Sequence, residues 1–312
     1  MVSEQGQSTK NVCVIGAGPS GLWLYEPNVE KEDPLGKNKF LDVHSSVYDS
    51  LRIVSPREIM GFTDFPFVSK KNRDTRRFPG HKELWLYLKD FCEYFGLKEM
   101  IRFNTRVEYV GMLDYGVFGK DLKWVVKSKE KKGEKRVEEV FDAVIVATGH
   151  YSQPRCKPVN LVGMDAWKRK QIHSHVYRVP EPFRNEVVVI VGNSLSGQDI
   201  SMEIVKVAKE VYLSAKSLEV TEGLSKVISK HRNLHLYPQI QSLHEDGRVE
   251  FEDGSCVIAD TIIYCTGYSY AFPFLDTKGI VGVDDNRVGP LFEHTFPPSL
   301  APSLSFIGIP RK

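Results

Sequence analysis

The sequence predicts an α/β fold in which one nucleotide-binding domain is inserted into another of the same kind. Three observations predict it. A full strand–turn–helix–strand unit lies at 187–217, a second glycine-rich turn follows a strand at 16–21, and the apolar runs in 142–149 and 260–267 both end in Thr-Gly. These paired strand ends flank the 187–217 unit. They indicate a chain that leaves one nucleotide domain, builds a second and returns to the first.

The unit at 187–217 has each part of a nucleotide-binding motif. It opens with the apolar run VVVIV, which has the length of a buried parallel strand and is too short for a membrane span. The turn at 192–197 has glycine at the first and third positions of the dinucleotide-binding pattern. A helix to about 209 and a strand at 211–215 are expected to follow. Such a unit directs backbone N–H groups and the positive end of a helix at a pyrophosphate.

Two residues refine this assignment. Ser194 replaces the middle glycine and offers a hydroxyl group to a phosphate. Lys216 stands at the end of the second strand, where a carboxylate would bind the free ribose 2′-hydroxyl of NAD and a cation suits the 2′-phosphate of NADP. A lone lysine at a strand end also fits a solvated surface position, but within this unit we prefer NADP. The candidate NADP-binding residues are Gly192, Asn193, Ser194, Leu195, Ser196, Gly197 and Lys216.

The first glycine turn carries all three glycines of the pattern and follows the apolar segment NVCVI. Its candidate nucleotide-binding residues are Gly16, Ala17, Gly18, Pro19, Ser20 and Gly21. The body of this unit is reduced, because Pro27 limits a helix begun at the turn to about two turns. The only candidate for a second strand is a stub at 40–43. We therefore expect an incomplete domain around this turn.

Composition limits the classes of function. The 42 Lys and Arg residues nearly balance the 40 Asp and Glu residues, for a net charge of +2, which does not favour a nucleic-acid partner. The polar start of the chain and the lack of a long apolar stretch lead us to expect a cytoplasmic protein without a membrane span. The five cysteines lack CxxC or zinc-site spacing and fit reduced thiols, with no metal site expected.

Other elements are expected outside the two glycine units. The apolar spacing predicts a helix over 78–96 and a strand over 101–110. Hairpins are expected at 122–140, with its turn at Gly133, and at 244–257.

The chain also carries long motifs in a fixed order: GAGPSGL at 16–22, HSSVYDSLR at 44–52, FPGHKEL at 78–84, ATGHYSQP at 147–154 and HSHVYRVPEPFR at 173–184. Together they resemble the flavin-containing monooxygenases, and most of all the plant glucosinolate S-oxygenase branch. The identifying pattern of that family, F-x-G-x-x-x-H-x-x-x-Y/F, falls on Trp167, Arg169, His173 and Tyr177, of which the last two match. By their spacing we expect both to be core or interface residues without a chemical role.

The resemblance implies two Rossmann-like domains: an FAD domain over 10–156 and 263–312, which is incomplete, and an NADP domain over 157–262. It implies FAD at the first glycine turn and NADPH at the second. It further implies that NADPH reduces the flavin, that O₂ reacts with it, and that a thioether, such as that of a methylthioalkyl glucosinolate, becomes a sulfoxide. No catalytic side chain is assigned, because the cofactors carry this chemistry.

The sequence departs from the family pattern in three places. Relatives have extra residues between GAGPSGL and the GLW-Y segment, where this chain passes directly from one to the other. They also have an asparagine beside the flavin where this chain has Val54, and further residues beyond GIPRK at 308–312. Valine can neither donate nor accept a hydrogen bond. These departures keep open an alternative, a catalytically inactive paralogue that retains only NADP binding. A dithiol reductase on the same plan is a third hypothesis, which the lack of CxxC opposes.

Overall fold

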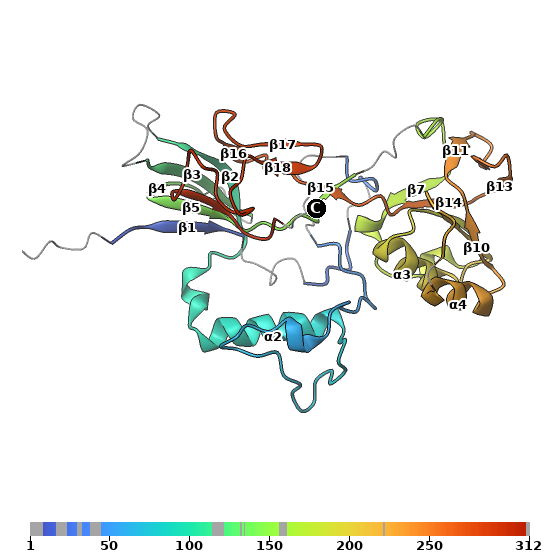
Figure 1. Ribbon diagram of the computed structural model, residues 1–312, viewed down its shortest axis with the longest axis horizontal. Coiled ribbons are helices and arrows are strands. Elements are labelled where there is room, and N and C mark those ends of the chain that lie inside the picture. The colour runs from blue at the N-terminus through green and yellow to red at the C-terminus, as the bar shows by residue number, and fades with distance from the viewer. Residues whose placement is uncertain are drawn as a thin grey trace, which may run out of the picture. The chain divides into compact units, whose positions relative to one another are not determined.

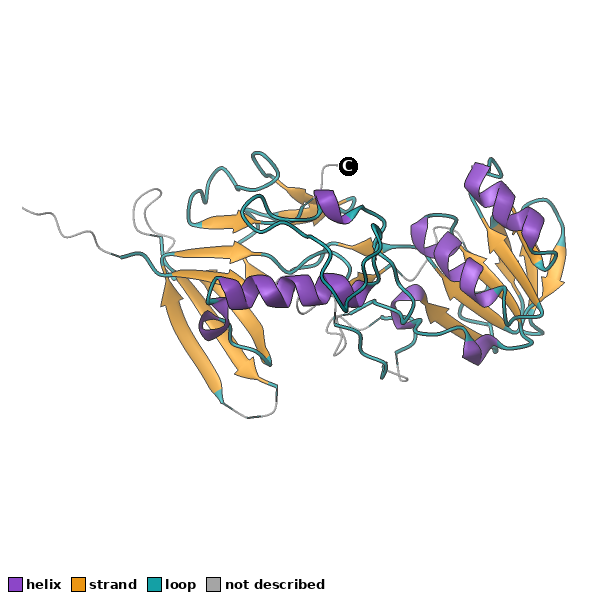
Figure 2. Cartoon of the chain, turned by 90° about the horizontal axis from the view of Figure 1, so that it is seen from below, coloured by secondary structure: helices purple, strands orange, loops and turns teal. Residues whose placement is uncertain are grey.

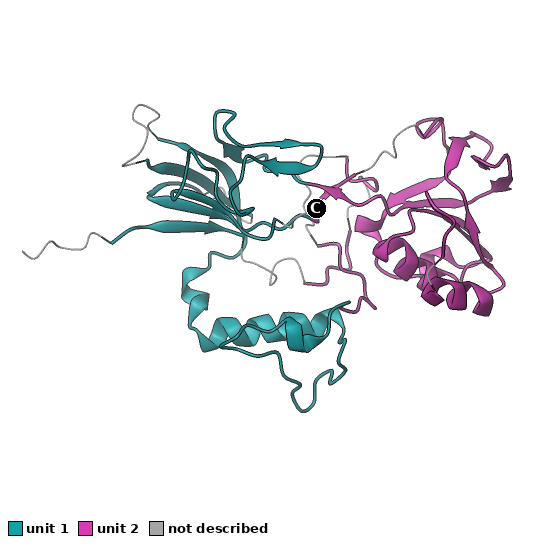
Figure 3. Ribbon diagram, viewed as in Figure 1, with its two compact units in different colours: residues 1–23, 54–150, 270–312 teal, residues 24–53, 151–269 magenta. Residues whose placement is uncertain are grey.

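The computed structural model describes residues 9–16, 24–29, 33–37, 45–113, 122–131, 133, 135–155, 161–220 and 222–309. The chain forms two compact units (Figure 3). Residues 1–23, 54–150 and 270–312 belong to unit 1, and residues 24–53 and 151–269 belong to unit 2. Each unit contains one parallel β-sheet, so the α/β class and the insertion of one nucleotide-type domain into another are confirmed.

Unit 2 is built on a five-stranded parallel sheet in the order β10-β9-β8-β14-β7 (Figure 1). Its strands are β7 (Lys170–His173), β8 (Val187–Val191), β9 (Glu210–Ser214), β10 (Leu234–Tyr237) and β14 (Thr261–Tyr264). Helix α3 (Leu195–Ile204) connects β8 to β9, and α4 (Glu222–Lys230) precedes β10. The two strands expected in 187–217 are confirmed. The helix is shorter than expected, because the chain turns after Ile204 and the Lys209 N–H donates to Glu186 O.

Both faces of this sheet are buried. One face packs against α3 and α4, which lie on the same side of the sheet in Figures 1 and 2. The other face packs against a three-stranded antiparallel sheet of β11 (Ile240–Leu243), β12 (Arg248–Phe251) and β13 (Cys256–Ile258), which confirms the hairpin expected at 244–257. Burial on both faces explains why the central strand β8 reads as a continuous apolar run.

Unit 1 contains a three-stranded parallel sheet in the order β1-β5-β19, formed by β1 (Val12–Ile15), β5 (Ala143–Val146) and β19 (Leu304–Phe306). One of its faces packs on a four-stranded sheet of β2 (Thr105–Met112), β3 (Trp124–Glu130), β4 (Arg136–Phe141) and β16 (Leu275–Asp276). Trp124, which is fully buried, lies at the centre of this core. The hairpin expected at 122–140 is confirmed as β3 and β4.

The edge of this parallel sheet differs from its counterpart in unit 2. Strand β8 has neighbours on both sides, whereas β1 pairs only with β5 among the described residues. Val12 and Val14 alternate with the more buried Cys13 and Ile15, and are 48% and 56% exposed. A strand equivalent to β9 is therefore absent from the described part of unit 1. The stub at 40–43 lies outside the described residues.

Helix α2 (His81–Tyr94) confirms the helix expected over 78–96. It is preceded by Gly80 and followed by Gly96, whose φ of 63° is the left-handed conformation that ends a helix. The strand expected from 101 begins only at Thr105, because Asn104, with φ 54°, first turns the chain. The remaining short elements are η1 (Arg57–Ile59), η2 (Leu97–Met100), η3 (Ser174–Val176), η4 (Glu181–Phe183), β6 (Gln153–Pro154), β15 (Tyr268–Ser269), β17 (Gly282–Asp284) and β18 (Arg287–Gly289). Among the described residues, no helix has the length and apolar character needed to cross a bilayer.

Candidate functional site

The turn after β8 is closed against the end of β14. Gly192 has φ 109°, and a Cβ atom added to it would lie 2.6 Å from Cys265 O. The Gly192 N–H donates to Ser214 O at 2.9 Å, and the Cys265 N–H donates to Val191 O at 2.8 Å. Both the backbone conformation and the lack of space therefore require glycine at 192.

The second glycine of the turn brings α3 against the strand end. A Cβ atom on Gly197 would lie only 1.8 Å from Gly192 O, so the helix approaches as closely as backbone allows. Ser194 precedes the helix, and its side chain makes no capping hydrogen bond. Ser194, Leu195 and Ser196 are all exposed. The first N–H groups of α3 thus face outward at the positive end of the helix, where an anion is stabilised.

Asn193 gives an independent indication of a ligand in this turn. Its Oδ1 atom is buried and has no hydrogen-bond partner among the described residues. Its backbone oxygen, in contrast, accepts a hydrogen bond of 3.1 Å from Gln198 Nε2. Buried acceptors are nearly always paired in folded proteins. A hydroxyl or amide group of a bound dinucleotide would supply the missing donor, so the residues of this turn fit such a ligand.

Lys216 lies at the same edge of the sheet. It follows β9, the strand next to β8, and its side chain is exposed. The structure therefore brings Lys216 to the carboxyl edge that also holds residues 192–197, as expected for a group that meets the ribose end of a dinucleotide.

His173 and Tyr177 lie in the core of unit 2, as expected, and are 0% and 1% exposed. The His173 ring Nδ1 accepts a hydrogen bond from the His175 N–H at 3.0 Å, and its Nε2 lies 3.1 Å from Gly267 O. Burial is the main cause that lowers the pKa of His173 to about 3, so the ring is neutral at physiological pH. A neutral ring then carries its proton on Nε2 and donates it to Gly267 O.

Arg178 is a buried cation that sequence reasoning missed. Its guanidinium group donates to four backbone oxygens, those of Glu26 at 2.6 Å and of Ser45, His175 and Tyr177 at 2.8 Å each. Burial lowers its pKa. These bonds attach the segments 24–29 and 45–48 to unit 2. Because all four acceptors are main-chain atoms, no side-chain pattern in the sequence pointed to them.

Gly16, the first residue of the first glycine turn, repeats the geometry of Gly192. Gly16 has φ 106°, and a Cβ atom on it would lie 2.4 Å from Ala147 O, just as Gly192 meets Cys265. The Thr-Gly turns after β5 and β14 also match, since Gly149 and Gly267 have φ values of 71° and 79°. The other candidate residues of the first turn, Ala17, Gly18, Pro19, Ser20 and Gly21, lie outside the described residues.

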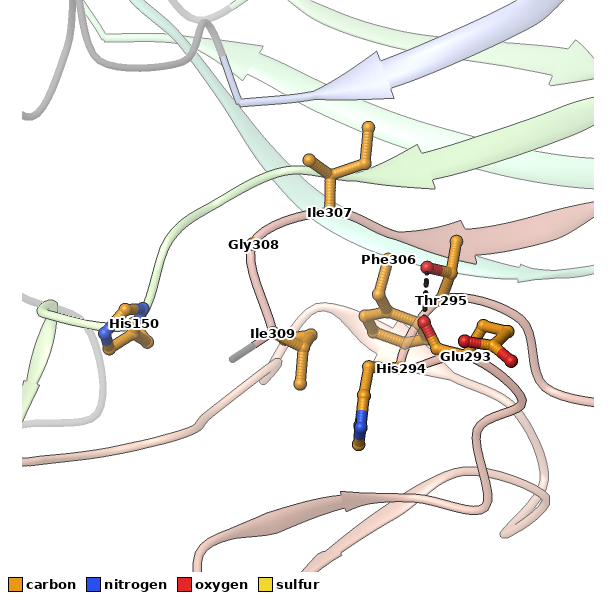
Figure 4. A pocket seen from close by; sticks show the side chains of 8 residues that line it. All are labelled: His150, Glu293, His294, Thr295, Phe306, Ile307, Gly308 and Ile309. Atoms are coloured by element: carbon orange, nitrogen blue, oxygen red, sulfur yellow. Dashed lines mark hydrogen bonds between the residues drawn. The ribbon is translucent and has the colours of Figure 1, made fainter. Parts of the chain in front are cut away.

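An open pocket of about 350 Å³ lies beyond the carboxyl ends of β5 and β19 in unit 1 (Figure 4). His150, which follows β5, and Ile307 and Ile309, which follow β19, line it together with Glu293 and His294. The carboxyl ends of parallel strands are where open α/β sheets bind ligands. With Gly16 this edge fits the pyrophosphate part of a dinucleotide. No acidic residue from a strand beside the outer edge of β1 is present in the described part of the unit.

Val54, the residue at the place of the family's asparagine, is 70% exposed. Its apolar side chain offers no hydrogen bond to a flavin. Val54 therefore contributes no polar group to unit 1, and it is not among the residues that line the pocket in the described part of the unit.

Comparisons with known proteins cover nearly the whole chain. The model of the flavin-binding monooxygenase-like family matches residues 9–231 and 225–312. "Flavin-containing monooxygenase FMO GS-OX-like 8" of Arabidopsis thaliana is 65% identical over 331 residues, which cover 97% of this chain and 71% of the relative. "Flavin-containing monooxygenase FMO GS-OX5" of the same plant is 51% identical and shares 96% of this chain and 69% of its own length. An alignment of 331 residues exceeds this chain of 312, so the first relative has residues that this chain lacks.

Solved structures give the same result. The S-allyl-L-cysteine S-oxygenase of Allium sativum superposes with a TM-score of 0.86 at 44% identity, over 97% of this chain and 72% of that protein. A flavin-containing monooxygenase of Stenotrophomonas maltophilia shares the fold, with a TM-score of 0.70 at 20% identity over 96% of this chain and 90% of its own.

Proposed function

Because the chain belongs to the flavin-binding monooxygenase-like family, and is thus a flavin-dependent monooxygenase with FAD and NADP as cofactors, we propose that it is an NADPH-dependent S-oxygenase. The reaction takes NADPH, a proton, O₂ and a thioether, and yields NADP⁺, water and a sulfoxide. When bound, the flavin supplies the redox chemistry of oxygen transfer. The residues of this chain bind and orient the two dinucleotides.

The geometry after β8 is the observation that carries the NADPH assignment. Gly192 and Gly197 let the backbone and α3 approach a pyrophosphate, and the outward N–H groups at the start of α3 would bind its oxygens. Lys216 would pair with the 2′-phosphate at the end of β9. At the first turn, Gly16 would take the corresponding place for FAD.

The proposed substrate is a thioether of the kind found in methylthioalkyl glucosinolates. Its support comes from relatives: several Arabidopsis thaliana proteins at 43% to 65% identity carry GS-OX names, and the Allium sativum structure at 44% identity is that of an S-allyl-L-cysteine S-oxygenase. Both names denote oxidation at sulfur in a small molecule.

A second candidate function is NADP binding without oxygenation. The specific observation in its favour is strand β1, whose outer edge is unpaired among the described residues and whose Val12 and Val14 are exposed. A domain that lacks a neighbouring strand beside its glycine turn holds a dinucleotide through fewer contacts. The two candidates differ in whether flavin stays bound.

The first test is the visible absorption spectrum of the chain after expression with excess FAD and desalting. A flavin band near one per chain, followed by NADPH-dependent incorporation of ¹⁸O from ¹⁸O₂ into a methylthioalkyl glucosinolate, is the expected result. The variant Gly16→Asp, which cannot form the first turn, is the matched control and should lose the band. A colourless wild-type chain that still binds NADPH would establish the second candidate instead.

Lys216→Ala tests the choice between NADP and NAD. Removing the cation should weaken NADP binding about tenfold, which is about 1.4 kcal/mol, and leave NAD binding unchanged. Isothermal titration with both dinucleotides measures this difference. Equal weakening for NADP and NAD would contradict the assignment of Lys216 to the 2′-phosphate.

A further inference from the structure

Two carboxylates on α3 are held by two tyrosines that come from outside the helix. Asp199 and Glu203 lie one helical turn apart. The Tyr48 hydroxyl donates to Asp199 Oδ2, and the Tyr177 hydroxyl donates to Glu203 Oε2 at 2.7 Å. The tyrosines are 6% and 1% exposed, so both bonds originate in the core.

The two tyrosines belong to one packed block. Their ring centroids are 5.4 Å apart in an edge-to-face arrangement. The main chain around them is joined as well, because Asp49 N donates to Arg178 O at 2.9 Å and Arg178 Nη2 donates to Ser45 O at 2.8 Å. Two fixed donors therefore meet two acceptors on successive turns of α3, which sets both the rotation and the axial position of the helix.

This polar arrangement is costly for stability alone. Burial and the nearby Asp199 raise the pKa of Glu203, which shows that its charge is disfavoured where it lies. Like charges four residues apart also destabilise a helix. Apolar side chains of similar volume would fill the same core at no such cost. Apolar surfaces in contact can slide past one another, whereas directional hydrogen bonds hold the helix in a single position.

The position of α3 determines the geometry of the nucleotide turn. The helix starts directly after Ser194, and Gly197 is in such close contact with Gly192 that a shift of the helix moves the whole turn. Its first N–H groups are those that would bind the pyrophosphate. We propose that Tyr48 and Tyr177 are positioning residues for NADP, which act through Asp199 and Glu203 by fixing the helix that forms the phosphate site. This inference rests on the proposed binding of NADP at the turn after β8.

The test compares tyrosine-to-phenylalanine variants that remove single hydroxyl groups. Tyr48→Phe, Tyr177→Phe and the double variant are titrated with NADP by calorimetry, and their melting temperatures are recorded. The double variant should bind NADP about tenfold more weakly, which is the factor that corresponds to about 1.4 kcal/mol. Glu203→Gln, which keeps an acceptor for Tyr177, should weaken binding less than Glu203→Leu.

Tyr264→Phe is the matched control. Tyr264 lies in the same unit, is 0% exposed, and donates to Gln171 Oε1 at 2.7 Å, but it packs on the face of the sheet opposite α3. Its variant should lower the melting temperature to a similar degree and leave the NADP affinity unchanged. If a general loss of stability were what weakens NADP binding, the Tyr264 variant would weaken it as much as the Tyr48 and Tyr177 variants do.

The outcomes separate this inference from the proposed function. A wild-type chain that does not bind NADP would overturn both. If the wild type binds NADP and the Tyr48 and Tyr177 variants bind it equally well, the positioning role is wrong while the proposed function stands. If Tyr264→Phe weakens binding as much as the double variant does, the positioning role is likewise wrong, because any lost buried hydroxyl then has the same effect.

Discussion

Ser194 is the residue at which the stability of α3 and its affinity for phosphate can be separated. In Ser194→Asp, a carboxylate replaces a hydroxyl at a position where aspartate is a preferred helix N-cap, so the melting temperature should be unchanged or higher. The same carboxylate faces the proposed pyrophosphate. Two like charges about 4 Å apart near a protein surface repel by about 4 kcal/mol, so NADP affinity should fall at least about tenfold.

The neutral variant Ser194→Asn is the control for this prediction, because it also caps the helix but carries no charge. Calorimetric titration with NADP and thermal melting of both variants are the measurements. If Ser194→Asp binds NADP as tightly as Ser194→Asn does, no phosphate lies at the start of α3.

His173 makes stability depend on pH. Its folded-state pKa of about 3 lies below the value of about 6.5 for an unfolded chain. Between these values the unfolded state binds a proton that the folded state does not, so the free energy of unfolding falls as the pH drops from about 6.5 towards 3. The slope from this one group is about 1.4 kcal/mol per pH unit.

Urea unfolding at several pH values from about 4.5 to about 7 measures how steeply the free energy of unfolding changes with pH. His173→Gln keeps a donor for Gly267 O and cannot titrate, so its stability should vary less with pH than that of the wild type. His235→Gln is the control at a side chain that is 36% exposed. Equal slopes in the wild type and His173→Gln would mean that the buried ring is not held neutral.

At the residue scale, local patterns predicted the glycine turn after β8 and pointed to Lys216 as a candidate, but they predicted none of the long-range pairs. The spacing of glycines follows from backbone geometry within a few residues, and Gly192 and Gly197 have the conformations and close contacts that the pattern requires. The bond from Tyr48 to Asp199 joins residues 151 positions apart. Nothing in the neighbourhood of either residue selects the other, so this contact required the fold.

At the scale of elements, the strands that were predicted are those that read as an apolar run or lie in a hairpin around a glycine turn. The run at 187–191 is confirmed to the residue as β8, and the hairpins at 122–140 and 244–257 are present. Strands β7 and β10 were not predicted. They form the two edges of the sheet of unit 2 and contain polar residues, as in KQIH and LHLY, so they lack a continuous apolar run.

Strand β1 is the element from which self-association is expected. Its outer edge is unpaired among the described residues, and Val14 is 56% exposed on its apolar face. Exposed edges with apolar side chains pair with other chains, and a lysine at such an edge prevents it. Val14→Lys should therefore lower the aggregated fraction of the protein in light scattering.

The control is Ile59→Lys, in the short helix η1, where the replaced side chain is 73% exposed but does not lie on a strand. It changes the net charge by the same amount. If both lysine variants reduce scattering equally, charge rather than the edge of β1 governs solubility.

At the scale of the whole molecule, the return of the chain to its first domain was predictable, but the membership of residues 24–53 was not. The Thr-Gly turns after β5 and β14 predicted the insertion. The end of each strand packs against the first glycine of its own nucleotide turn, Gly16 or Gly192. Residues 24–53 follow the first turn in sequence and yet belong to unit 2, to which the bonds of Arg178 attach them. Backbone acceptors leave no signature in a sequence.

Because the two units have separate hydrophobic cores, each cofactor should stabilise only the unit that binds it against thermal unfolding. A ligand present at about 100 times its dissociation constant stabilises the state that binds it by about 2.7 kcal/mol. NADP should therefore raise the transition of unit 2, and FAD that of unit 1, in differential scanning calorimetry. A single transition that NADP alone raises in full would show instead that the units unfold as one.

The four hydrogen bonds of Arg178 limit which substitutions the protein can accept at that position. Its four acceptors are main-chain oxygens, so the bonds of Arg178 to residues 26 and 45 do not depend on which side chains those residues carry. The arginine itself has no substitute, because a lysine ammonium group has three donors and no planar fork to reach four oxygens. Random mutagenesis should accordingly tolerate almost no residue other than arginine at 178.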